Sequence, residues 1–125
     1  MKSHNIDQFF VQELIVSDYY LRILVIGGKV VGAIKRFTLQ RLARAKVDKL
    51  ERSQLHHLTS TERTLAVKAA RAVNADIAGL DLIYDEKNKP FVLEVNRCPE
   101  FTCFTRVTGI DAAAEIIKFL ETIKK

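Results

Sequence analysis

Three oxygen-bearing side chains in the second half of the chain have the types and spacing of a divalent-metal site. Asp81 lies within an apolar segment, 77–84, and Glu94 and Asn96 lie within a second one, 91–96. The polar residues between the two segments are typical of a turn, so both segments are predicted to be strands that pair about it. Side chains two apart in a strand share a face, so Glu94 and Asn96 point the same way. If the two strands pair, Asp81 can lie on that face as well. Two carboxylates and an amide oxygen favour Mg²⁺ or Mn²⁺, above all when phosphate oxygens complete the coordination.

An ion pair is the alternative explanation for each carboxylate. A carboxylate near the end of an apolar strand is often paired with lysine or arginine, because a buried charge needs a partner but not specifically a metal. The chain has 20 Lys and Arg residues. The spacing of the three side chains alone leaves both explanations open.

The composition is that of one domain with a substantial core. The chain has 125 residues, of which 48% are hydrophobic, and it has no low-complexity tract. No segment approaches the roughly 20 apolar residues that span a bilayer, and the N-terminus has no signal-peptide pattern. We therefore expect a soluble cytoplasmic protein, without membrane association, in which Cys98 and Cys103 are reduced thiols. Zinc bound by these thiols and His56–His57 is disfavoured, because the two histidines are adjacent.

The formal net charge of +5 is distributed unevenly. Residues 29–52 hold eight basic side chains and only two acidic ones, Asp48 and Glu51. Such a segment could bind nucleic acid or a phosphate-bearing ligand, or it could be a solvated surface. Phe37 is the only aromatic residue in it, which argues against binding of single-stranded nucleic acid by base stacking.

The elements that must position the three oxygen donors are predicted to form an α+β fold. Gly27 and Gly28 can supply the positive φ angles of a tight turn, which predicts a hairpin. The segments expected as strands are Phe9–Ile15, 22–26, 29–35, 77–84 and 91–96. They predict a mainly antiparallel sheet with its helices on one face. Residues 1–8 are expected to be frayed or disordered, and residues 9–125 to form the domain.

Two helices are expected. Thr59 and Glu62 have the spacing of a capping box, so a helix is predicted to begin there and to run to about Val73. Asp111 suits the positive end of a second helix, and the residues from 97 to 108 are expected to form a loop. The residues expected to be buried are Leu65, Ala69, Ala72 and Val73 in the first helix, and Ala113, Ile116, Ile117 and Leu120 in the second.

Several ordered segments of the chain together resemble the ATP-grasp superfamily. Within it, the nearest resemblance is to the glutamate ligases that extend peptide or cofactor carboxylates, including those that modify ribosomal proteins. The segments are Val11–Ile15, Leu21–Gly28, Ala33–Arg36, Ile77–Ile83, Leu93–Asn96, Cys98–Phe101 and Thr108–Asp111. The match runs from about Phe9 to Leu120 and resembles the family's C-terminal subdomain.

The resemblance implies a carboxylate–amine ligase that uses ATP with Mg²⁺ (or Mn²⁺). In such enzymes ATP phosphorylates a carboxylate to an acyl phosphate, and an amine then displaces the phosphate to form an amide. The resemblance implies glutamate as one of the two substrates. The site must neutralise and align the transferring phosphoryl group. Asp81, Glu94 and Asn96 match the family's metal ligands.

The resemblance also implies contacts to nucleotide and substrate. Glu13–Leu14 matches the segment whose backbone meets the adenine. Arg22 and Arg36 match basic positions, here expected to be catalytic, that face the phosphates or the substrate, and surface ion pairs are the alternative for both. The family's ribose-binding acid falls on Tyr20, and Asp18 is the expected substitute.

The segment from 41 to 57 departs from the family pattern. The family's Arg-x-Asn motif falls on Arg44, Ala45 and Lys46, and the Gly-Gly pair that follows it falls on Leu50 and Glu51. The first three positions are expected to contact the nucleotide, and the arginine to be catalytic. A lysine, however, cannot be an oxygen ligand. The loss of the glycines also removes the backbone freedom for a close approach to a ligand.

Two functions of different classes follow. The first is an ATP-dependent ligase, of which this chain is the C-terminal part. A partner chain would supply the family's N-terminal half, and the apolar surface left uncovered predicts a homodimer. The second is a non-catalytic remnant that binds an acidic partner or nucleic acid through the basic segment 29–52.

Overall fold

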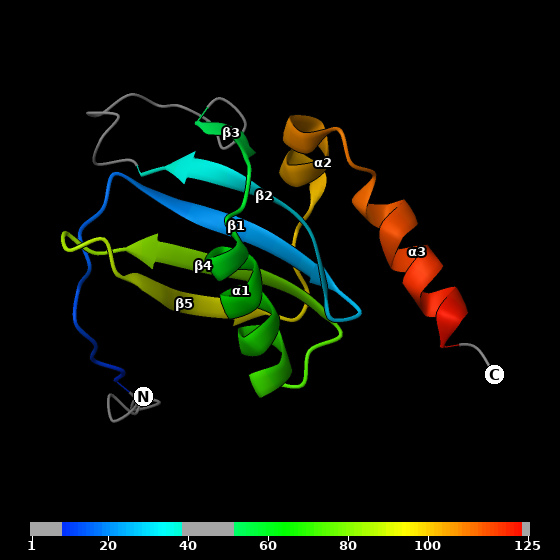
Figure 1. The fold of residues 1–125 in the computed structure, drawn as a ribbon, viewed down its shortest axis with the longest axis horizontal. Helices are drawn as coiled ribbons and strands as arrows, with labels where there is room; N and C mark the ends of the chain where they lie inside the picture. Colours follow the sequence, from blue (N-terminus) through cyan, green and yellow to red (C-terminus); the bar gives the residue numbers. More distant parts are fainter. Residues whose placement is uncertain (1–8, 39–51, 124–125) are drawn as a thin grey trace, which may run out of the picture.

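The structure, a computed structural model, describes residues 9–38 and 52–123. Within these residues it has a five-stranded antiparallel sheet in the order β3-β2-β1-β4-β5 (Figure 1). The strands are β1 (Tyr19–Ile26), β2 (Lys29–Phe37), β3 (Ser53–His56), β4 (Ile77–Tyr84) and β5 (Pro90–Asn96). The helices are α1 (Ser60–Ala72), α2 (Thr102–Thr108) and α3 (Ala112–Thr122). The α+β class and the antiparallel sheet are confirmed, whereas residues 1–8 lie outside the described part.

The predicted hairpin joins β1 and β2. Gly27 and Gly28 have φ angles of 59° and 76°, which a two-residue turn between right-twisted strands requires and which side chains with a Cβ disfavour. The amide of the first glycine donates to the carbonyl oxygen of Asp76 at 2.7 Å. A Cβ at position 27 would lie 2.6 Å from the ring of Phe119. The turn therefore also provides the seat on which α3 packs.

The helices cover both faces of the sheet, so the expectation that they lie on one face is wrong. Consecutive residues of β1 show the division. Ile23 belongs to the core that holds Ala66 of α1, whereas Leu24 belongs to the core that holds Phe104 of α2 and Ala112 of α3. A central strand that is apolar on both sides needs a cover on each side, and α1 alone provides only one.

A β-bulge in β5 decides which side chains reach the face under α2 and α3. The register pairs Asp81 with Glu94, but the next residue of β4, Leu82, pairs with Val92. Leu93 is therefore an extra residue in β5. Without the bulge, Leu93 would pair with Asp81, and the alternation of the strand would turn the Glu94 side chain toward the core under α1. With it, Glu94 shares the face of Asp81 while Val92 stays against that core.

The capping box at the start of α1 is confirmed. The Thr59 hydroxyl accepts a hydrogen bond from the Glu62 amide at 3.1 Å, and the Glu62 carboxylate accepts one from the Thr59 amide at 2.9 Å. The same carboxylate accepts from Tyr84 Oη at 2.7 Å and contacts His56 Nε2 at 3.0 Å. Glu62 is only 4% exposed, and it ties α1 to β3 and β4.

The buried faces of the helices differ from the expectation. In α1 the buried apolar residues are Ala66 and Ala70, and in α3 only Ala112 is fully buried. Three of the expected residues are half-buried: Leu65, Ala69 and Ile116. Five are exposed: Ala72, Val73, Ala113, Ile117 and Leu120. The predictions for these five are wrong, because α3 meets the sheet mainly at the hairpin and α1 turns its last residues toward solvent.

Two further segments differ from the expectation. Residues 9–17 form no strand, and Phe10 and Val11 are 85% and 90% exposed, because the edges of the described sheet are β3 and β5. The segment expected as a loop contains α2, whose N-cap Phe101 makes no side-chain capping hydrogen bond. The helix therefore had no start signal in the sequence, although Gly109 ends it in the left-handed conformation typical of a C-cap.

The remaining expectations concern cysteines, zinc and the membrane. Cys98 and Cys103 are both thiols that form no disulfide within the described residues, the first exposed and the second buried. Among residues 9–38 and 52–123, no three His, Cys, Asp or Glu side chains gather in a way that could hold a metal ion. None of the described helices is long and apolar enough to cross a membrane.

Candidate functional site

Neighbouring strands bring the three predicted oxygen donors to one face. Asp81 of β4 and Glu94 of β5 are direct cross-strand partners, and Asn96 lies opposite Gly79, two residues before the aspartate. On the other side of β4, Asp81 lies opposite Arg22 of β1. We call Asp81, Glu94 and Asn96 the donor set. Three adjacent strands thus place an arginine, two carboxylates and an amide together on the face that α2 and α3 cover.

Asp81 is already engaged by an arginine. Arg22 Nε donates to Asp81 Oδ1, and Arg22 Nη2 donates to Asp81 Oδ2 at 3.0 Å. Burial alone would lower the pKa of Arg22, but the hydrogen bonds and charge of Asp81 outweigh it, and the pKa is raised. The ion-pair alternative is therefore what the structure shows for this carboxylate.

The other two members of the donor set are less engaged. Glu94 is exposed and makes no hydrogen bond or ion pair with any residue of the described part. The Asn96 side-chain oxygen accepts from the Cys98 amide at 2.9 Å and keeps a second lone pair. In donor type and common face the set fits a hard divalent cation. A cation bound there would compete with Arg22 for Asp81.

A close backbone approach at Gly79 shapes the end of this site. A Cβ at position 79 would lie 2.7 Å from Pro99 Cβ and 3.6 Å from Arg22 Cδ. The absence of a side chain lets the chain turn back over β4 directly after Asn96. The turn keeps the donor set next to the segment 97–101 that leads into α2.

Arg36, the second predicted arginine, lies on β2 opposite Tyr20 and is only 4% exposed. Its Nε donates to Ser53 Oγ at 3.1 Å, and its Nη1 donates to Tyr20 Oη at 3.3 Å. Burial lowers its pKa, but the hydrogen bond to Tyr20 and the contact with Cys103 outweigh it and raise the pKa. No carboxylate of the described part forms an ion pair with it. Its charge is therefore shared among hydroxyl and thiol groups.

A pocket of about 350 Å³ lies at the start of β1, and we call it the hinge pocket. Its lining residues are Leu14, Ile15, Val16, Ser17, Tyr20, Thr38, Arg52 and Ile83. Tyr20 lies two residues from Arg22 on β1, and Ile83 lies two residues from Asp81 on β4. The hinge pocket therefore adjoins the donor set along the same face.

The other two residues of the predicted nucleotide contact lie beside the hinge pocket. Glu13 lines a neighbouring pocket of about 300 Å³ with Leu14 and residues 85–87. Asp18 is exposed, and its backbone oxygen accepts from the Thr38 amide at 2.8 Å. The carboxylate of Asp18 does not line the hinge pocket.

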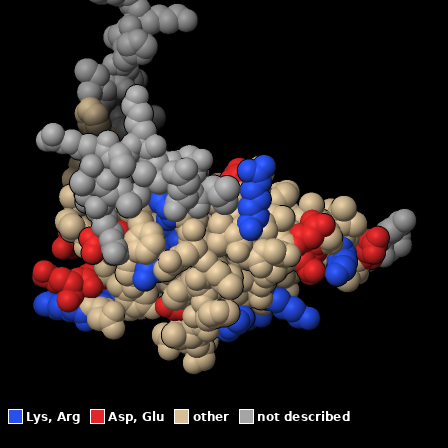
Figure 2. Space-filling model, turned by 90° about the horizontal axis from the view of Figure 1, so that it is seen from above, with Lys and Arg blue, Asp and Glu red and all other residues tan. Residues whose placement is uncertain are grey.

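The motif residues Arg44, Ala45 and Lys46, and the positions of the lost glycines, lie outside the described residues, as does most of the basic segment. On the face shown in Figure 2, acidic and basic side chains are interspersed over the described part, without a continuous basic patch.

Arg52 was not predicted as a site residue. Its Nε is buried and has no hydrogen-bond partner, and its Nη1 donates to the Phe37 carbonyl oxygen at 3.4 Å. The only signal in the sequence is a basic side chain at the end of the basic segment, directly before β3.

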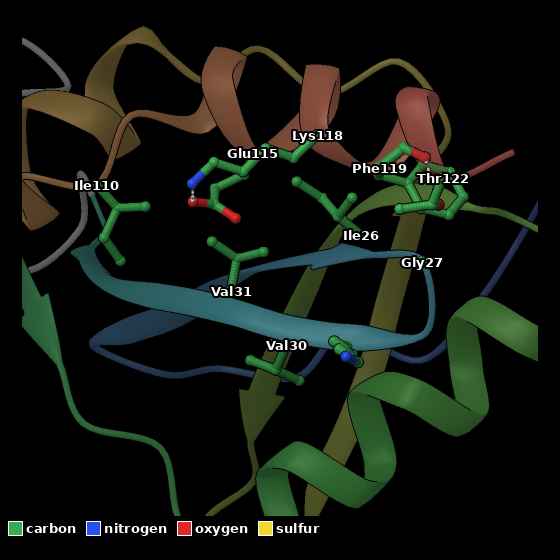
Figure 3. A pocket seen from close by; sticks show the side chains of 10 residues that line it. Ile26, Gly27, Val30, Val31, Ile110, Glu115, Lys118, Phe119 and Thr122 are labelled. Atoms are coloured by element: carbon green, nitrogen blue, oxygen red, sulfur yellow. Dashed lines mark hydrogen bonds and ion pairs between the residues drawn. The ribbon is translucent and has the colours of Figure 1, made fainter. Parts of the chain in front are cut away.

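A larger pocket, of about 580 Å³, lies between the hairpin and α3 (Figure 3). Ile26 and Val31 of the sheet face Ile110 and Phe119 across it, and Lys118 donates to Glu115 at 3.3 Å at its rim. None of the predicted site residues lines this pocket. Its walls combine apolar side chains with Lys29, Glu115, Lys118 and Thr122.

Comparison with known proteins places the fold in a family. The profile of the RimK-like ATP-grasp domain matches residues 1–120. The chain is 34% identical to a probable alpha-L-glutamate ligase of Halorhodospira halophila over 125 residues, which are 100% of this chain and 40% of that relative. It is 32% identical to the ribosomal protein bS6–L-glutamate ligase of Shigella flexneri serotype 5b over 121 residues, 97% of this chain and 39% of that relative.

A solved structure agrees with the sequence comparison. The ATP-grasp ligase PsnB, in complex with a phosphomimetic variant of its minimal precursor, Mg and ADP, superposes with a TM-score of 0.71 and 22% identity, over 89% of this chain and 34% of PsnB. The chain belongs to the RimK-like ATP-grasp domain family. It spans about two fifths of the length of the curated relatives it matches.

Proposed function

We propose that this chain supplies the metal- and triphosphate-binding side of an ATP- and Mg²⁺-dependent carboxylate–amine ligase that works through an acyl phosphate. One observation carries the proposal: Arg22, Asp81, Glu94 and Asn96, from three adjacent strands, meet on one face. The names of the similar proteins, which are glutamate ligases and an ATP-grasp ligase crystallised with Mg and ADP, support it.

The donor set would hold Mg²⁺, or Mn²⁺ in its place. When bound, the cation neutralises triphosphate charge and polarises the transferring phosphoryl group. Arg22 is placed to donate its forked N–H groups to phosphate oxygens instead of Asp81. Asp81 then becomes available to the cation. In the absence of ligand, Arg22 and Asp81 neutralise each other.

The hinge pocket supports an orientation for the nucleotide. With the base against Leu14, Tyr20 and Ile83, the phosphates extend along the strands toward Arg22 and Asp81. The offset of two residues along a strand is about 7 Å, which suits the span from a nucleoside to its outer phosphates. In this orientation the backbone of Glu13 and Leu14 meets the base, and Asp18 stays the proposed carboxylate for the ribose.

The substrates would be a carboxylate and an amine, with glutamate as one of them. The names of the curated relatives support glutamate. Arg36, a buried cation without a carboxylate partner among the described residues, is suited to a substrate or phosphate oxyanion. Arg44, Ala45 and Lys46 stay proposed contacts from the resemblance alone.

We also propose that a further domain or a second chain covers the exposed apolar side chains at both ends of the described part. Phe9, Phe10 and Val11 are 77%, 85% and 90% exposed, and Ile117 and Ile123 are 57% and 56% exposed. Apolar surface of this kind favours association. Light scattering at high concentration tests whether the isolated chain forms a dimer, and a strict monomer would rule the homodimer out.

Calorimetry with a non-hydrolysable ATP analogue and Mg²⁺ tests the proposed function. Glu94→Gln removes an exposed charge that attracts Arg22 but makes no hydrogen bond or ion pair with the described residues, so its effect reports mainly on the ligand. We expect the Glu94→Gln, Asn96→Ala double variant to lose most of the Mg²⁺-dependent binding, and Glu121→Gln, at an exposed site on α3, to bind as wild type does. Equal binding by the double variant and wild type would refute the site.

A further inference from the structure

A groove of about 450 Å³ lies on the face of the sheet that α1 covers, opposite the face of the donor set. We call it the lysine groove. One wall is formed by α1, with Leu65 and Lys68, and the other by Lys89 and Pro90, where the turn between β4 and β5 leads into β5. Among the described residues, none that we propose to contact metal, nucleotide or substrate lines this groove.

Hydrogen bonds fix both walls of the lysine groove. Tyr84, the last residue of β4, donates from Oη to the Glu62 carboxylate at 2.7 Å and so ties α1 to the strand that leads into the turn. Within the turn, the Asp85 amide donates to the Lys89 carbonyl oxygen at 3.0 Å, and the Asp85 carboxylate accepts from the Lys87 and Lys89 amides at 2.9 and 2.8 Å. The groove is therefore preformed, which lowers the entropy cost of binding a ligand.

The lysine groove carries two positive charges. Neither Lys68 nor Lys89 forms an ion pair within the part of the chain that the structure describes, and no Asp or Glu of that part lines the groove. Lys89 Nζ lies 5.2 Å from the centre of the Phe91 ring, a contact that leaves its charge unneutralised. Asp85 and Glu86, although close to Lys89 in the sequence, line a different pocket. An anion in the groove would supply the missing counter-charge for both lysines.

Hydroxyl groups add hydrogen-bond donors to the α1 wall. The Thr64 hydroxyl donates to the Ser60 carbonyl oxygen at 3.0 Å. The hydroxyls of Ser60 and Thr61 make no hydrogen bond with a described residue, so they can donate to a ligand. Positions 60, 64 and 68 follow one another at about one helical turn, so the polar groups of this wall extend over about 12 Å. About four residues of an extended peptide have that length.

The lining favours the carboxylates of a peptide over phosphates. Leu65 and Pro90 give the groove apolar surface that suits an aliphatic side chain. No described arginine lines it, so it lacks the forked donors that suit phosphate, and no described aromatic side chain lines it on which a base could stack. The buried Glu62 carboxylate at the start of α1 also repels a dianion more strongly than a single negative charge.

We propose that the lysine groove binds an extended acidic segment of a partner protein. Carboxylates of the segment pair with Lys68 and Lys89, and an aliphatic side chain between them packs against Leu65 and Pro90. This inference goes beyond the proposed function, because it places a second binding surface on the opposite side of the sheet and requires neither metal nor nucleotide.

Peptide titrations of the full 125-residue chain, followed by the NMR signals of its backbone amides, test the inference. The probe is the peptide Glu-Glu-Leu-Glu-Glu, blocked at both ends, and Gln-Gln-Leu-Gln-Gln is its uncharged control. Tripolyphosphate and oligothymidylate represent phosphate-bearing ligands. The double variant Lys68→Gln, Lys89→Gln removes both groove charges, and Lys68→Arg, Lys89→Arg keeps them. The matched control, Lys29→Gln, Lys118→Gln, removes two exposed charges outside the groove.

We expect the acidic peptide to shift the amide signals of residues 60–68 and Lys89 and to leave those of Asp81 and Glu94 unchanged. The Lys68→Gln, Lys89→Gln variant should bind it about five- to tenfold more weakly than wild type, whereas the arginine variant and the matched control should stay within about twofold. The uncharged peptide and both phosphate probes should bind at these amides more weakly than the acidic peptide.

Other outcomes would overturn the inference. Shifts confined to other residues, or no shifts, would show that the acidic peptide has no site in the lysine groove. Wild-type affinity in Lys68→Gln, Lys89→Gln, or an equal loss in the matched control, would leave the two lysines without a specific role. Equal binding of the uncharged peptide would assign the affinity to apolar contacts, and tighter binding of either phosphate probe would assign the groove to a phosphate-bearing ligand. Binding of a Mg²⁺–nucleotide complex to the donor set is measured separately, so the proposed function does not fail with this inference.

Discussion

Arg22 and Asp81 lie opposite each other on β1 and β4 and form a two-pronged ion pair beside Glu94 and Asn96. The pair keeps an arginine and a carboxylate, both largely shielded from water, neutral as a unit while no ligand is bound. Because phosphate attracts the arginine and a cation attracts the carboxylate, a Mg²⁺–nucleotide complex can satisfy both groups at once. Either component alone satisfies only one of them and leaves the other without its partner.

Arg22→Gln should therefore change the two affinities in opposite directions. The variant frees Asp81, so binding of Mg²⁺ alone should tighten severalfold, while binding of the Mg²⁺–ATP analogue should weaken on the order of tenfold. Titration calorimetry measures both. The control is Arg63→Gln on the exposed side of α1. Unchanged affinity for free Mg²⁺ would show that the ion pair does not compete with the cation.

Asp81→Asn and Glu94→Gln should separate stability from binding. The first leaves a partly buried arginine without its counter-charge, so we expect a loss of about 1–3 kcal/mol in the free energy of unfolding. The second removes an exposed charge that attracts Arg22 without a hydrogen bond or ion pair, so stability should change by less than about 0.5 kcal/mol. Urea denaturation measures both. A large loss of stability in Glu94→Gln would mean that the residue has a structural partner.

Glu62 should give the fold a dependence on acid. Burial raises the pKa of its carboxyl, but the hydrogen bonds from Tyr84, His56 and the Thr59 amide outweigh it, and the pKa is lowered. A lowered pKa in the folded state stabilises the fold above the unfolded-state value of about 4.3, and this contribution is lost as the pH falls through the folded value.

The free energy of unfolding of wild type should accordingly exceed that of Glu62→Gln by about 2 kcal/mol at neutral pH. This difference should shrink below about pH 4. Melting temperatures between pH 3 and 7 measure it. Glu86→Gln, in the exposed turn before β5, should follow wild type throughout. A difference that stays constant over this range would show that the charge of Glu62 contributes nothing.

Gly79→Ala should disturb the chain that follows the donor set. The new methyl group would lie 2.7 Å from Pro99 Cβ, so either β4 or the segment after Asn96 must shift. We expect a loss of about 1–3 kcal/mol in unfolding free energy and weaker Mg²⁺–nucleotide binding. Gly109→Asn is the control, because position 109 has open space around it and a left-handed φ that asparagine tolerates. A Gly79→Ala variant as stable as wild type would show that the segment yields freely.

Local signals were enough to predict some elements of the fold. The glycine pair between two apolar runs predicted the hairpin, and the Thr59–Glu62 spacing predicted the start of α1. Elements without such a signal were not predicted: α2 has no capping side chain, and β3 is short and follows a run of charged residues. The strand expected at Phe9–Ile15 failed for a different reason. Its apolar residues fit a core, but the described sheet offers them no partner.

The site was predictable to the extent that it depends on alternation within a strand. Glu94 and Asn96 share a face by spacing alone, whereas their position on the face of Asp81 depends on the bulge at Leu93. No motif in the sequence predicts this bulge. The Arg22–Asp81 pair could not be predicted, because β1 and β4 are distant in the sequence and become neighbours only in the sheet. Arg52 could not be predicted either, because an unmet hydrogen bond is visible only in three dimensions.

The extra residue Leu93 has a practical consequence for protein engineers. Anyone who transplants this pair of strands onto another scaffold, or repairs β5 to an ideal geometry, must carry the irregularity along or delete Leu93 outright. Substituting it leaves the count of residues unchanged and is harmless to the arrangement. A residue inserted between Leu93 and Glu94 would instead turn Glu94 toward the core under α1 and Val95 toward the opposite face.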